Sequence, residues 1–254
     1  MATTGFFREG GALVCDGVSL ESIAATEGTP LYVYDAEAID AQIAKLKDAF
    51  AGIPFRPFYA MKANGNVNLL RFIREHGFGC DAVSPGEIFL ARRAGFEPDA
   101  IWFTCSNVSD DDLRAIPDPR IVINVNSVSE IDRCLKLDLE NPIALRINPD
   151  VGAGHHRDVV TAGGGVKFGI DLAELDDARI LVEDAGRHIV GLHAHIGSQI
   201  FDMTAFELAA KRMAEFVARV SDEVGFSPRE LNLGGGFGIA HTEDELTPAP
   251  QTSA

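Results

Sequence analysis

Short apolar runs alternate with amphipathic segments along most of the chain. The runs have the continuous hydrophobicity of strands that are buried on both faces of a sheet. They cover residues 55–61, 79–84, 101–105, 121–125, 143–147, 189–195 and 231–233. Apolar residues at helical spacing predict helices near 67–75, 87–94, 110–115, 129–135, 172–185 and 204–224.

Strands that alternate with helices predict right-handed parallel crossovers and an α/β fold. The pattern gives seven strand–helix units, one fewer than a closed TIM-type (β/α)8 barrel. A doubly wound open sheet is the competing architecture. The first strand is not followed by a G-x-G-x-x-G turn, which disfavours the dinucleotide-binding form of that sheet. Ahead of this region, residues 1–30 form a short segment of mixed apolar and polar residues with no clear pattern. Residues 31–34 predict a strand, and residues 35–50 predict a helix.

Composition narrows the class of protein. A chain of 254 residues with 46% hydrophobic composition can bury one sizeable core. The formal charge of −16 disfavours nucleic acid as a partner. The cysteines have neither C-x-x-C nor metal-site spacing, so we expect reduced thiols, no metal and a cytoplasmic location. We expect no signal peptide, and no run reaches the ~18 apolar residues that a membrane helix needs.

Lys62 is the first candidate for chemistry. It ends the apolar run 55–61 and precedes the turn residues Ala63, Asn64 and Gly65. Barrels and open sheets place their active sites at such strand ends. A desolvated lysine amine in that position can hold a carbonyl group as a Schiff base. The alternative is an ordinary surface lysine at a strand end.

Two late strands end in residues suited to an anion. Strand alternation puts His193 and His195 on one face, and Ser198 follows them in a turn. The last strand ends in Gly234, Gly235 and Gly236, whose backbone N–H groups can form a phosphate nest. Buried structural histidines and an ordinary tight turn are the alternatives.

A lysine on the first barrel strand and a phosphate nest on the late strands together suit one ligand that carries an aldehyde and a phosphate. Pyridoxal 5′-phosphate fits that description. The connection 148–169 is long, rich in glycine and histidine, and leaves the end of a strand where this ligand would lie.

Several motifs in this order resemble those of the diaminopimelate decarboxylase family. These enzymes are fold-type III pyridoxal-phosphate decarboxylases with an alanine racemase-like barrel. The motifs lie at 59–64, 79–87, 146–150, 167–169, 195–199 and 234–236, and the resemblance runs from about residue 29 to 239. Gln199 and the 148–169 connection are closer to the diaminopimelate enzymes than to ornithine decarboxylases.

The resemblance implies a role for each matching residue. Lys62 would hold pyridoxal 5′-phosphate and reprotonate the product, and His195 would stack on the ring. Ser198 and Gly234 to Gly236 would grip the phosphate. Asp81 and Arg146 would set the charge and orientation of Lys62, although a structural ion pair between them is an equal alternative.

The family reaction is the decarboxylation of meso-2,6-diaminopimelate to L-lysine and CO2 in lysine biosynthesis, by a homodimer. Related decarboxylases of carboxynorspermidine, ornithine or arginine are the nearest alternatives. The implied domains are an N-terminal segment at 1–30 that belongs to a β-domain, an incomplete barrel at 31–240 and a tail at 241–254.

The sequence departs from the family after Gly238. No Glu-Pro-Gly-Arg segment occurs in the 254 residues, and the family's eighth strand and C-terminal β-domain have no counterpart. We therefore expect this chain alone to bind the cofactor poorly and to turn over little substrate. A non-catalytic remnant, or a fragment that binds a missing C-terminal half as its partner, is the alternative from another class.

Overall fold

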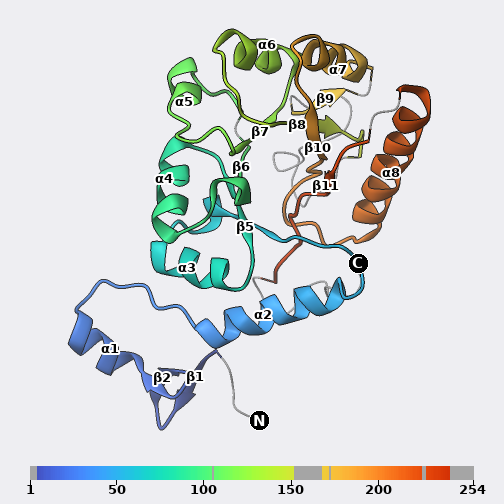
Figure 1. Ribbon diagram of the computed structural model, residues 1–254. Coiled ribbons are helices and arrows are strands. Elements are labelled where there is room, and N and C mark those ends of the chain that lie inside the picture. Colours follow the sequence, from blue (N-terminus) through green and yellow to red (C-terminus); the bar gives the residue numbers. More distant parts are fainter. Residues whose placement is uncertain (1–4, 105, 152–167, 172, 225–226, 241–254) are drawn as a thin grey trace. The chain divides into compact units, whose positions relative to one another are not determined.

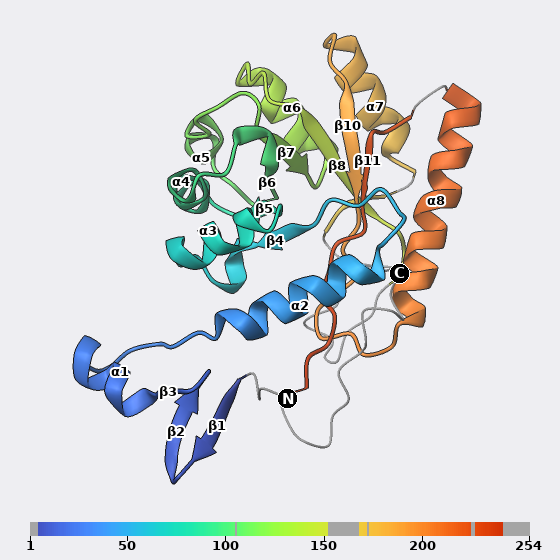
Figure 2. The same cartoon turned by 60° about the horizontal axis from the view of Figure 1, so that its bottom comes forward.

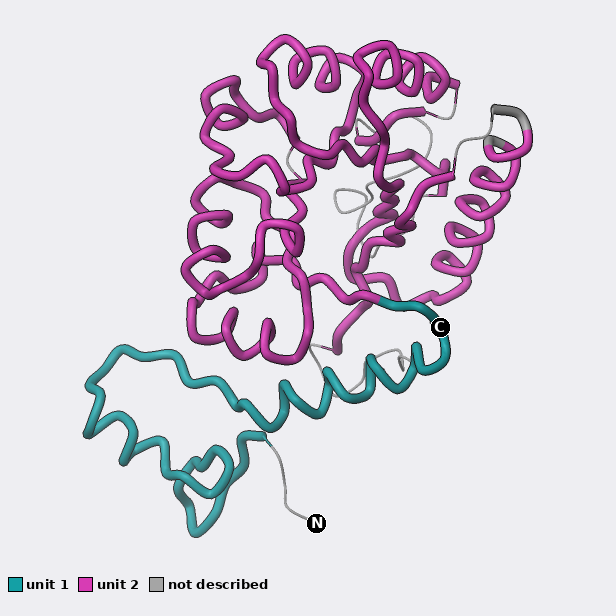
Figure 3. Tube along the Cα trace, in the orientation of Figure 1, with its two compact units in different colours: residues 1–55, 254 teal, residues 56–253 magenta. Residues whose placement is uncertain are grey.

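The computed structural model describes residues 5–104, 106–151, 168–171, 173–224 and 227–240. They form two compact units, residues 1–55 and 56–253, which are coloured separately in Figure 3. Each unit is described by itself below. The domain division expected at residues 30 and 240 stays a prediction.

The first unit contains three short antiparallel strands and two helices. The strands are β1 (Phe6–Glu9), β2 (Ala12–Cys15) and β3 (Val18–Ser19), and the helices are α1 (Leu20–Glu27) and α2 (Ala36–Ala49). Asp35 caps α2 by accepting a hydrogen bond from the Ala38 N–H, which confirms the predicted helix. The predicted strand at 31–34 is wrong, because these residues pair with no neighbouring strand and Tyr32 is 89% exposed.

The second unit contains one curved parallel sheet whose strands follow one another in sequence order. Its strands are β4 (Phe58–Ala60), β5 (Gly79–Ala82), β6 (Ile101–Phe103), β7 (Val122–Val125), β8 (Ile143–Asn148), β10 (Ile189–His193) and β11 (Glu230–Asn232). All seven predicted strands are confirmed. The short strand β9 (Ile170–Asp171), which the sequence did not predict, pairs with the end of β8.

Helices cover the outer side of this sheet (Figures 1 and 2). They are α3 (Val67–Glu75), α4 (Pro85–Ala94), α5 (Asp110–Arg114), α6 (Val128–Lys136), α7 (Leu175–Asp184) and α8 (Thr204–Val224), with one-turn 3-10 helices η1 (Met61–Ala63) and η2 (Pro98–Ala100). The six predicted helices are all present. A doubly wound sheet has helices on both faces and a reversal of strand order. The sequential order and the outer helices exclude that architecture and establish the barrel kind.

Three consecutive strand–helix turns begin their helices in the same way. In each, a serine side chain accepts a hydrogen bond from the backbone N–H of an acidic residue three positions later. The pairs are Ser84 with Glu87, Ser109 with Asp112, and Ser127 with Glu130. The acidic side chain bonds a backbone N–H at the start of the same turn. These caps stop each strand at the edge where the site lies.

Both faces of the sheet are buried. Alternate strand residues face the helices, as Ile143, Leu145 and Ile147 do in β8. The opposite face carries a separate apolar group formed by Trp102, Val122 and Ala144, with Phe58 and Val190 packed against it. Barrel interiors are filled by such side-chain layers. In the described part of the sheet, no backbone pairing joins β4 to β11, so the strands form an open arc.

Candidate cofactor site

Every predicted site residue lies at or just beyond the carboxyl end of a strand. Lys62 follows β4, Asp81 lies in β5, Arg146 in β8, His195 and Ser198 follow β10, and Gly234, Gly235 and Gly236 follow β11. Parallel strands bring these ends to one edge of the sheet. Lys62 and Arg146 act electrostatically on both Asp81 and His195, so these four groups form one cluster.

Lys62 differs from expectation in its environment. Its side chain is exposed rather than desolvated. The physical reason is its position: η1 carries the lysine past the end of β4, a strand that pairs on one side only in the described sheet. The amine is therefore accessible to a carbonyl ligand.

Asp81 is the carboxylate of the cluster. Burial raises its pKa to about 6, whereas a hydrogen bond from Thr104 and the charges of Lys62 and Arg146 act in the opposite direction. Its Oδ1 atom is buried and has no hydrogen-bond partner among the described residues. No ion pair joins Asp81 to Arg146 in this part of the chain, so the structural ion pair considered from the sequence is not formed.

Arg146 is held in place by its surroundings. It is 7% exposed, its Nη1 atom donates to Asn126 Oδ1 at 3.1 Å, and its guanidinium lies 5.0 Å from the centre of the Phe168 ring. Asn126 is itself fixed, because its backbone N–H donates to Glu130 at 2.6 Å. Burial lowers the pKa of Arg146. The group remains a fixed positive charge next to Asp81.

The two histidines share one face, as strand alternation predicts. Their ring centres lie 6.5 Å apart with an angle of 14° between the planes. Burial, followed by the charges of Arg146 and Lys62, lowers the pKa of His195 to about 4. Burial and Arg146 also hold the pKa of His193 well below its usual value. Both rings are therefore neutral at neutral pH.

The turns after β10 and β11 lie against each other. The Ile200 N–H donates to Gly236 O at 2.9 Å, and the Gly238 N–H donates to Ile200 O at 2.8 Å. Gln199 joins them further by accepting from the Ile239 N–H at 3.0 Å. The two candidate anion-binding turns thus form one surface.

The glycines of the second turn are not equivalent. The Gly234 N–H donates to Asn232 Oδ1 at 2.9 Å, so it is not available to a ligand. Within the described structure, the N–H groups of Gly235 and Gly236 have no partner. A Cβ on Gly236 would meet Gly197 O at 2.0 Å, whereas Gly235 faces open space. Two free donors beside open space suit a phosphate.

These observations fit pyridoxal 5′-phosphate. Lys62 offers an accessible amine, Gly235 and Gly236 offer free donors, and the Oδ1 atom of Asp81 is a buried acceptor without a partner. Gly234 also packs under the histidine, since a Cβ there would lie 3.0 Å from His195 Nδ1. The glycine turn therefore lies against His195, which belongs to the same cluster as Lys62.

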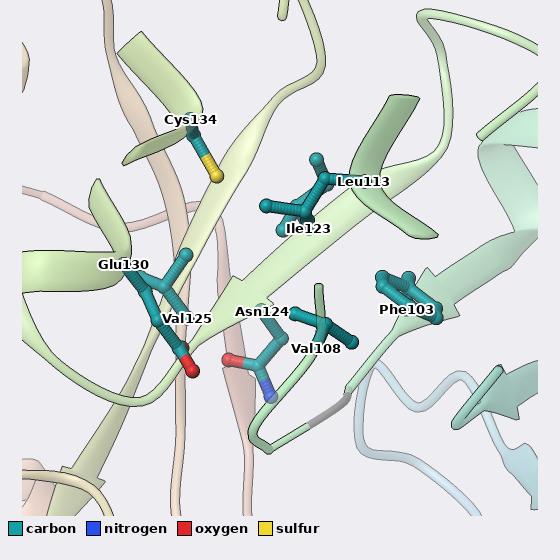
Figure 4. Close-up of a pocket in the computed structure, with 8 residues that line it drawn as sticks. All are labelled: Phe103, Val108, Leu113, Ile123, Asn124, Val125, Glu130 and Cys134. Atoms are coloured by element: carbon teal, nitrogen blue, oxygen red, sulfur yellow. The ribbon is translucent and has the colours of Figure 1, made fainter. Parts of the chain in front are cut away.

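A small cavity elsewhere in the unit does not serve as a ligand site. It lies between the sheet and helices α5 and α6 and is lined by Phe103, Val108, Leu113, Ile123, Asn124, Val125, Glu130 and Cys134 (Figure 4). It has room for at most about one water molecule. In Figure 4 the Asn124 amide points away from Leu113 and Ile123.

The sequence reading missed three residues of the inner face. Asn126 accepts a hydrogen bond from Arg146, and Asn124 hydrogen-bonds both Thr104 and His193. The available signal was an asparagine inside the otherwise apolar run 121–125. Most of the 148–169 connection, including Lys167 of its motif, lies outside the described residues.

Neither a metal site nor a membrane span was found where the structure could be searched. The described residues contain no group of His, Cys, Asp and Glu side chains that could hold a metal ion. None of the described helices is long and apolar enough to cross a membrane.

The sequential parallel barrel, the lysine after its first strand and the glycine turn after its last define the class of pyridoxal-phosphate-binding barrels. A sequence model of the pyridoxal-dependent decarboxylases, for their pyridoxal binding domain, matches residues 36–252. The chain belongs to this decarboxylase family.

Several proteins similar in sequence to this chain are diaminopimelate decarboxylases. That of Methanothermobacter thermautotrophicus is 41% identical over 238 residues, which are 92% of this chain and 56% of the relative. The diaminopimelate decarboxylase of Bacillus subtilis is 37% identical, over 92% of this chain and 56% of the relative. The chain thus spans a little over half the length of these relatives.

Solved structures agree with this assignment. The structure of diaminopimelate decarboxylase from Helicobacter pylori, complexed with L-lysine, matches with a TM-score of 0.82 at 30% identity. The match covers 92% of this chain and 60% of the Helicobacter pylori chain. The structure of the enzyme from M. jannaschii matches with a TM-score of 0.84 at 30% identity. This match covers 98% of this chain and 60% of the M. jannaschii chain.

Proposed function

We propose that this chain forms the cofactor-binding part of an enzyme that decarboxylates meso-2,6-diaminopimelate to L-lysine and CO2. The observation that carries the proposal is the placement of Lys62 and of the free Gly235 and Gly236 donors at one edge of the sheet. Diaminopimelate decarboxylases at 34–41% identity support the substrate. The arginine decarboxylase of Paramecium bursaria Chlorella virus, at 23% identity, shares the fold alone.

Pyridoxal 5′-phosphate, when bound, supplies an electron sink for the electron pair that remains on the substrate after CO2 departs. Lys62 would hold its aldehyde group through the side-chain amine and would supply a proton to the product carbon. The His195 ring would pack against the cofactor ring. Ser198, Gly235 and Gly236 would hold the phosphate, and Gly234 shapes the turn through its bond to Asn232.

By resemblance, Asp81 and Arg146 would set the charge and orientation of Lys62. A carboxylate and a fixed cation thus belong to the same cluster as the lysine. Arg146 is set by Asn126 and Phe168, which gives the cluster a defined orientation.

The setting of the enzyme is part of the proposal. Cys15, Cys80 and Cys134 are free, buried thiols, which suits the reducing cytoplasm. By resemblance we propose a homodimer, with the barrel at 31–240 as its cofactor-binding domain and 1–30 as part of a β-domain.

Capture of the cofactor tests the site. The chain is mixed with pyridoxal 5′-phosphate, reduced with borohydride, digested and analysed by mass spectrometry. We expect the label on Lys62 and its loss in Lys62→Ala. Lys136→Ala, which removes an exposed lysine on α6, serves as the control and keeps the label. A label spread over several lysines would contradict the assigned site.

Substrate choice is tested separately. Single-turnover release of CO2 from meso-diaminopimelate is compared with release from ornithine and arginine at high chain concentration. Release from diaminopimelate alone supports the proposed substrate. Release only from ornithine or arginine would replace it with one of the related decarboxylases.

A further inference from the structure

His193 is a buried side chain to which the function proposed above gives no role. It is 6% exposed and pairs in register with Arg146 of the neighbouring strand β8. Two residues earlier, a Cβ on Gly191 would meet the Trp102 ring at 3.1 Å, so strand alternation puts His193 on the same inner face. Its ring is nearly parallel to that of His195, with 6.5 Å between the ring centres. His193 therefore lies beside two residues of the candidate cofactor site.

Asn124 fixes the orientation of this ring. The Asn124 Nδ2 atom lies 2.8 Å from His193 Nδ1 and 3.1 Å from the Thr104 hydroxyl oxygen. The contact reaches from β7 to β10 across the intervening strand β8, where the small residue Ala144 pairs in register with Asn124. Asn124 is also buried, at 1% exposed. A hydrogen bond between two buried side chains is strong enough to hold both in one orientation.

The bonding capacity of the two side chains places the hydrogen of the ring. The two hydrogens of the amide nitrogen serve its two neighbours, so the Thr104 oxygen and His193 Nδ1 both accept from Asn124. Burial, followed by the charge of Arg146, holds the pKa of His193 well below its usual value, so the ring is neutral. A neutral ring whose Nδ1 atom accepts carries its single hydrogen on Nε2.

The Nε2–H group of His193 is a donor without an acceptor in the described part of the chain. Buried donors in folded proteins are almost always paired with another protein group, with water or with a ligand. The two nitrogens of an imidazole point in divergent directions, so Nε2 faces away from Asn124. Arg146, the register partner of His193, adds a fixed positive charge. A buried N–H group beside a cation suits an anionic oxygen.

We propose that His193 is a further ligand-binding residue of the cofactor site, and that its Nε2–H group, oriented by Asn124, donates to an anionic oxygen of the bound ligand. Two oxygens have this chemistry: the ring oxygen of pyridoxal 5′-phosphate and a carboxylate oxygen of the amino-acid substrate. The phosphate and the aldehyde of the cofactor are already assigned to the glycine turn and to Lys62. The inference rests on the proposed function, and the experiments below separate the failure of one from the failure of the other.

The first experiment reads the His193 ring by 15N NMR in the unaltered chain, free of cofactor. His193→Gln, which lacks the ring, assigns the signal. We expect the hydrogen on Nε2 and none on Nδ1. A hydrogen on Nδ1 would mean that the Asn124 amide is reversed and that Nε2 is an acceptor, which would overturn the proposal. This measurement needs neither cofactor nor substrate, so it holds even if the proposed activity fails.

The second experiment follows the Nε2–H proton in two complexes. In one, pyridoxal 5′-phosphate is fixed on Lys62 with borohydride. In the other, the phosphopyridoxyl conjugate of diaminopimelate, which needs no capture by Lys62, is added to the untreated chain. A downfield shift of the proton in the Lys62 complex identifies the cofactor ring oxygen as the acceptor, and a shift with the conjugate alone identifies the substrate carboxylate.

The second experiment has an internal control. His188 is exposed and precedes β10, at the amino end of the same strand, so its ring signals should not move in either complex. If the His193 Nε2–H proton moves in neither complex, this inference is overturned. Failure of capture at Lys62, with a shift on addition of the conjugate, would instead count against the proposed function.

Substitutions of His193 give a third measurement. His193→Gln keeps a side-chain N–H donor near the position of Nε2, whereas His193→Leu removes it. Fluorescence titration should show binding of the conjugate weakened about tenfold in His193→Leu, as expected for one hydrogen bond to a charged oxygen, and less than about threefold in His193→Gln. Equal weakening in the two variants would show that the ring only fills space, which would overturn its role as a donor.

Discussion

The Arg56 guanidinium and the Glu230 carboxylate, 174 residues apart, form an ion pair in which one Nη2 atom contacts both carboxylate oxygens at 2.9 and 3.0 Å. Arg56 precedes β4, and Glu230 begins β11, so the pair joins the amino ends of the first and last strands of the arc. The proposed cofactor site lies at the opposite ends of the strands. The ion pair therefore links the two edge strands away from the proposed site.

We expect this ion pair to contribute little to stability. Its side chains are 44% and 42% exposed, and exposed pairs contribute at most about 1 kcal/mol. A double-mutant cycle of Arg56→Ala and Glu230→Ala, followed by urea unfolding, measures the coupling. The coupling should shrink in 0.5 M salt, at roughly the screening expected for a surface pair. A coupling energy several times larger would show that closure of the arc depends on this contact.

The glycine turn gives a matched pair of substitutions. Gly236→Ala places a Cβ 2.0 Å from Gly197 O at φ +102°, so we expect a loss of about 2 kcal/mol or more in unfolding free energy and loss of cofactor capture. Gly235→Ala meets nothing within 4 Å, and its unfolding free energy should change by less than about 1 kcal/mol. Thermal unfolding of the two variants checks the contrast. If both variants lose the same amount of unfolding free energy, the backbone near Gly197 moves to make room for the new Cβ at little energetic cost.

The barrel could be predicted from the sequence because its signal is local. Each strand is a short apolar run, each helix repeats with helical spacing, and the serine caps separate them. The same signal failed at 31–34, where Leu31, Tyr32 and Tyr34 look like a strand but find no partner. Strand formation needs a neighbouring strand, which local composition does not reveal.

The site could be predicted only in part for a similar reason. Lys62 and Gly236 could be found because each belongs to a local pattern, a lysine between an apolar run and a turn and three successive glycines after the last strand. Thr104 and Asn124 acquire meaning only when the curved sheet brings β6 and β7 opposite His193. The exposure of Lys62 could not be predicted from the sequence either, because it depends on the edge position of β4 in the described sheet.

Glu130 connects a helix cap to the cofactor site. It accepts from the Asn126 N–H, and Asn126 accepts from Arg146. Glu130→Ala should cost about 1 kcal/mol of stability through the lost cap and should also weaken pyridoxal 5′-phosphate binding. Asp112→Ala removes the equivalent cap of α5, which has no such connection, and should reduce stability alone. Unfolding curves and cofactor titrations of both variants make the comparison; weakened binding in both would indicate a general loss of structure.

The pH dependence of stability follows from His195, His193 and Asp81. The pKa of His195 is lowered to about 4, so between pH 4 and 6.5 the unfolded chain binds more protons than the folded chain, and stability falls on acidification. His193 acts in the same direction. The pKa of Asp81 is raised to about 6, so its contribution is present at acid pH and is lost as the pH rises through 6.

The two histidines outweigh the single carboxyl group, so we expect the unfolding free energy to fall from pH 7 to pH 5. His195→Gln should reduce that fall by about 1 kcal/mol, a value that allows for solvent at a partly buried ring. Asp81→Asn should enlarge the fall, because it removes the group that opposes the histidines. Urea unfolding at the two pH values measures both changes. If His195→Gln loses as much stability on acidification as the unaltered chain, His195 titrates alike in the folded and unfolded chain, and burial does not lower its pKa.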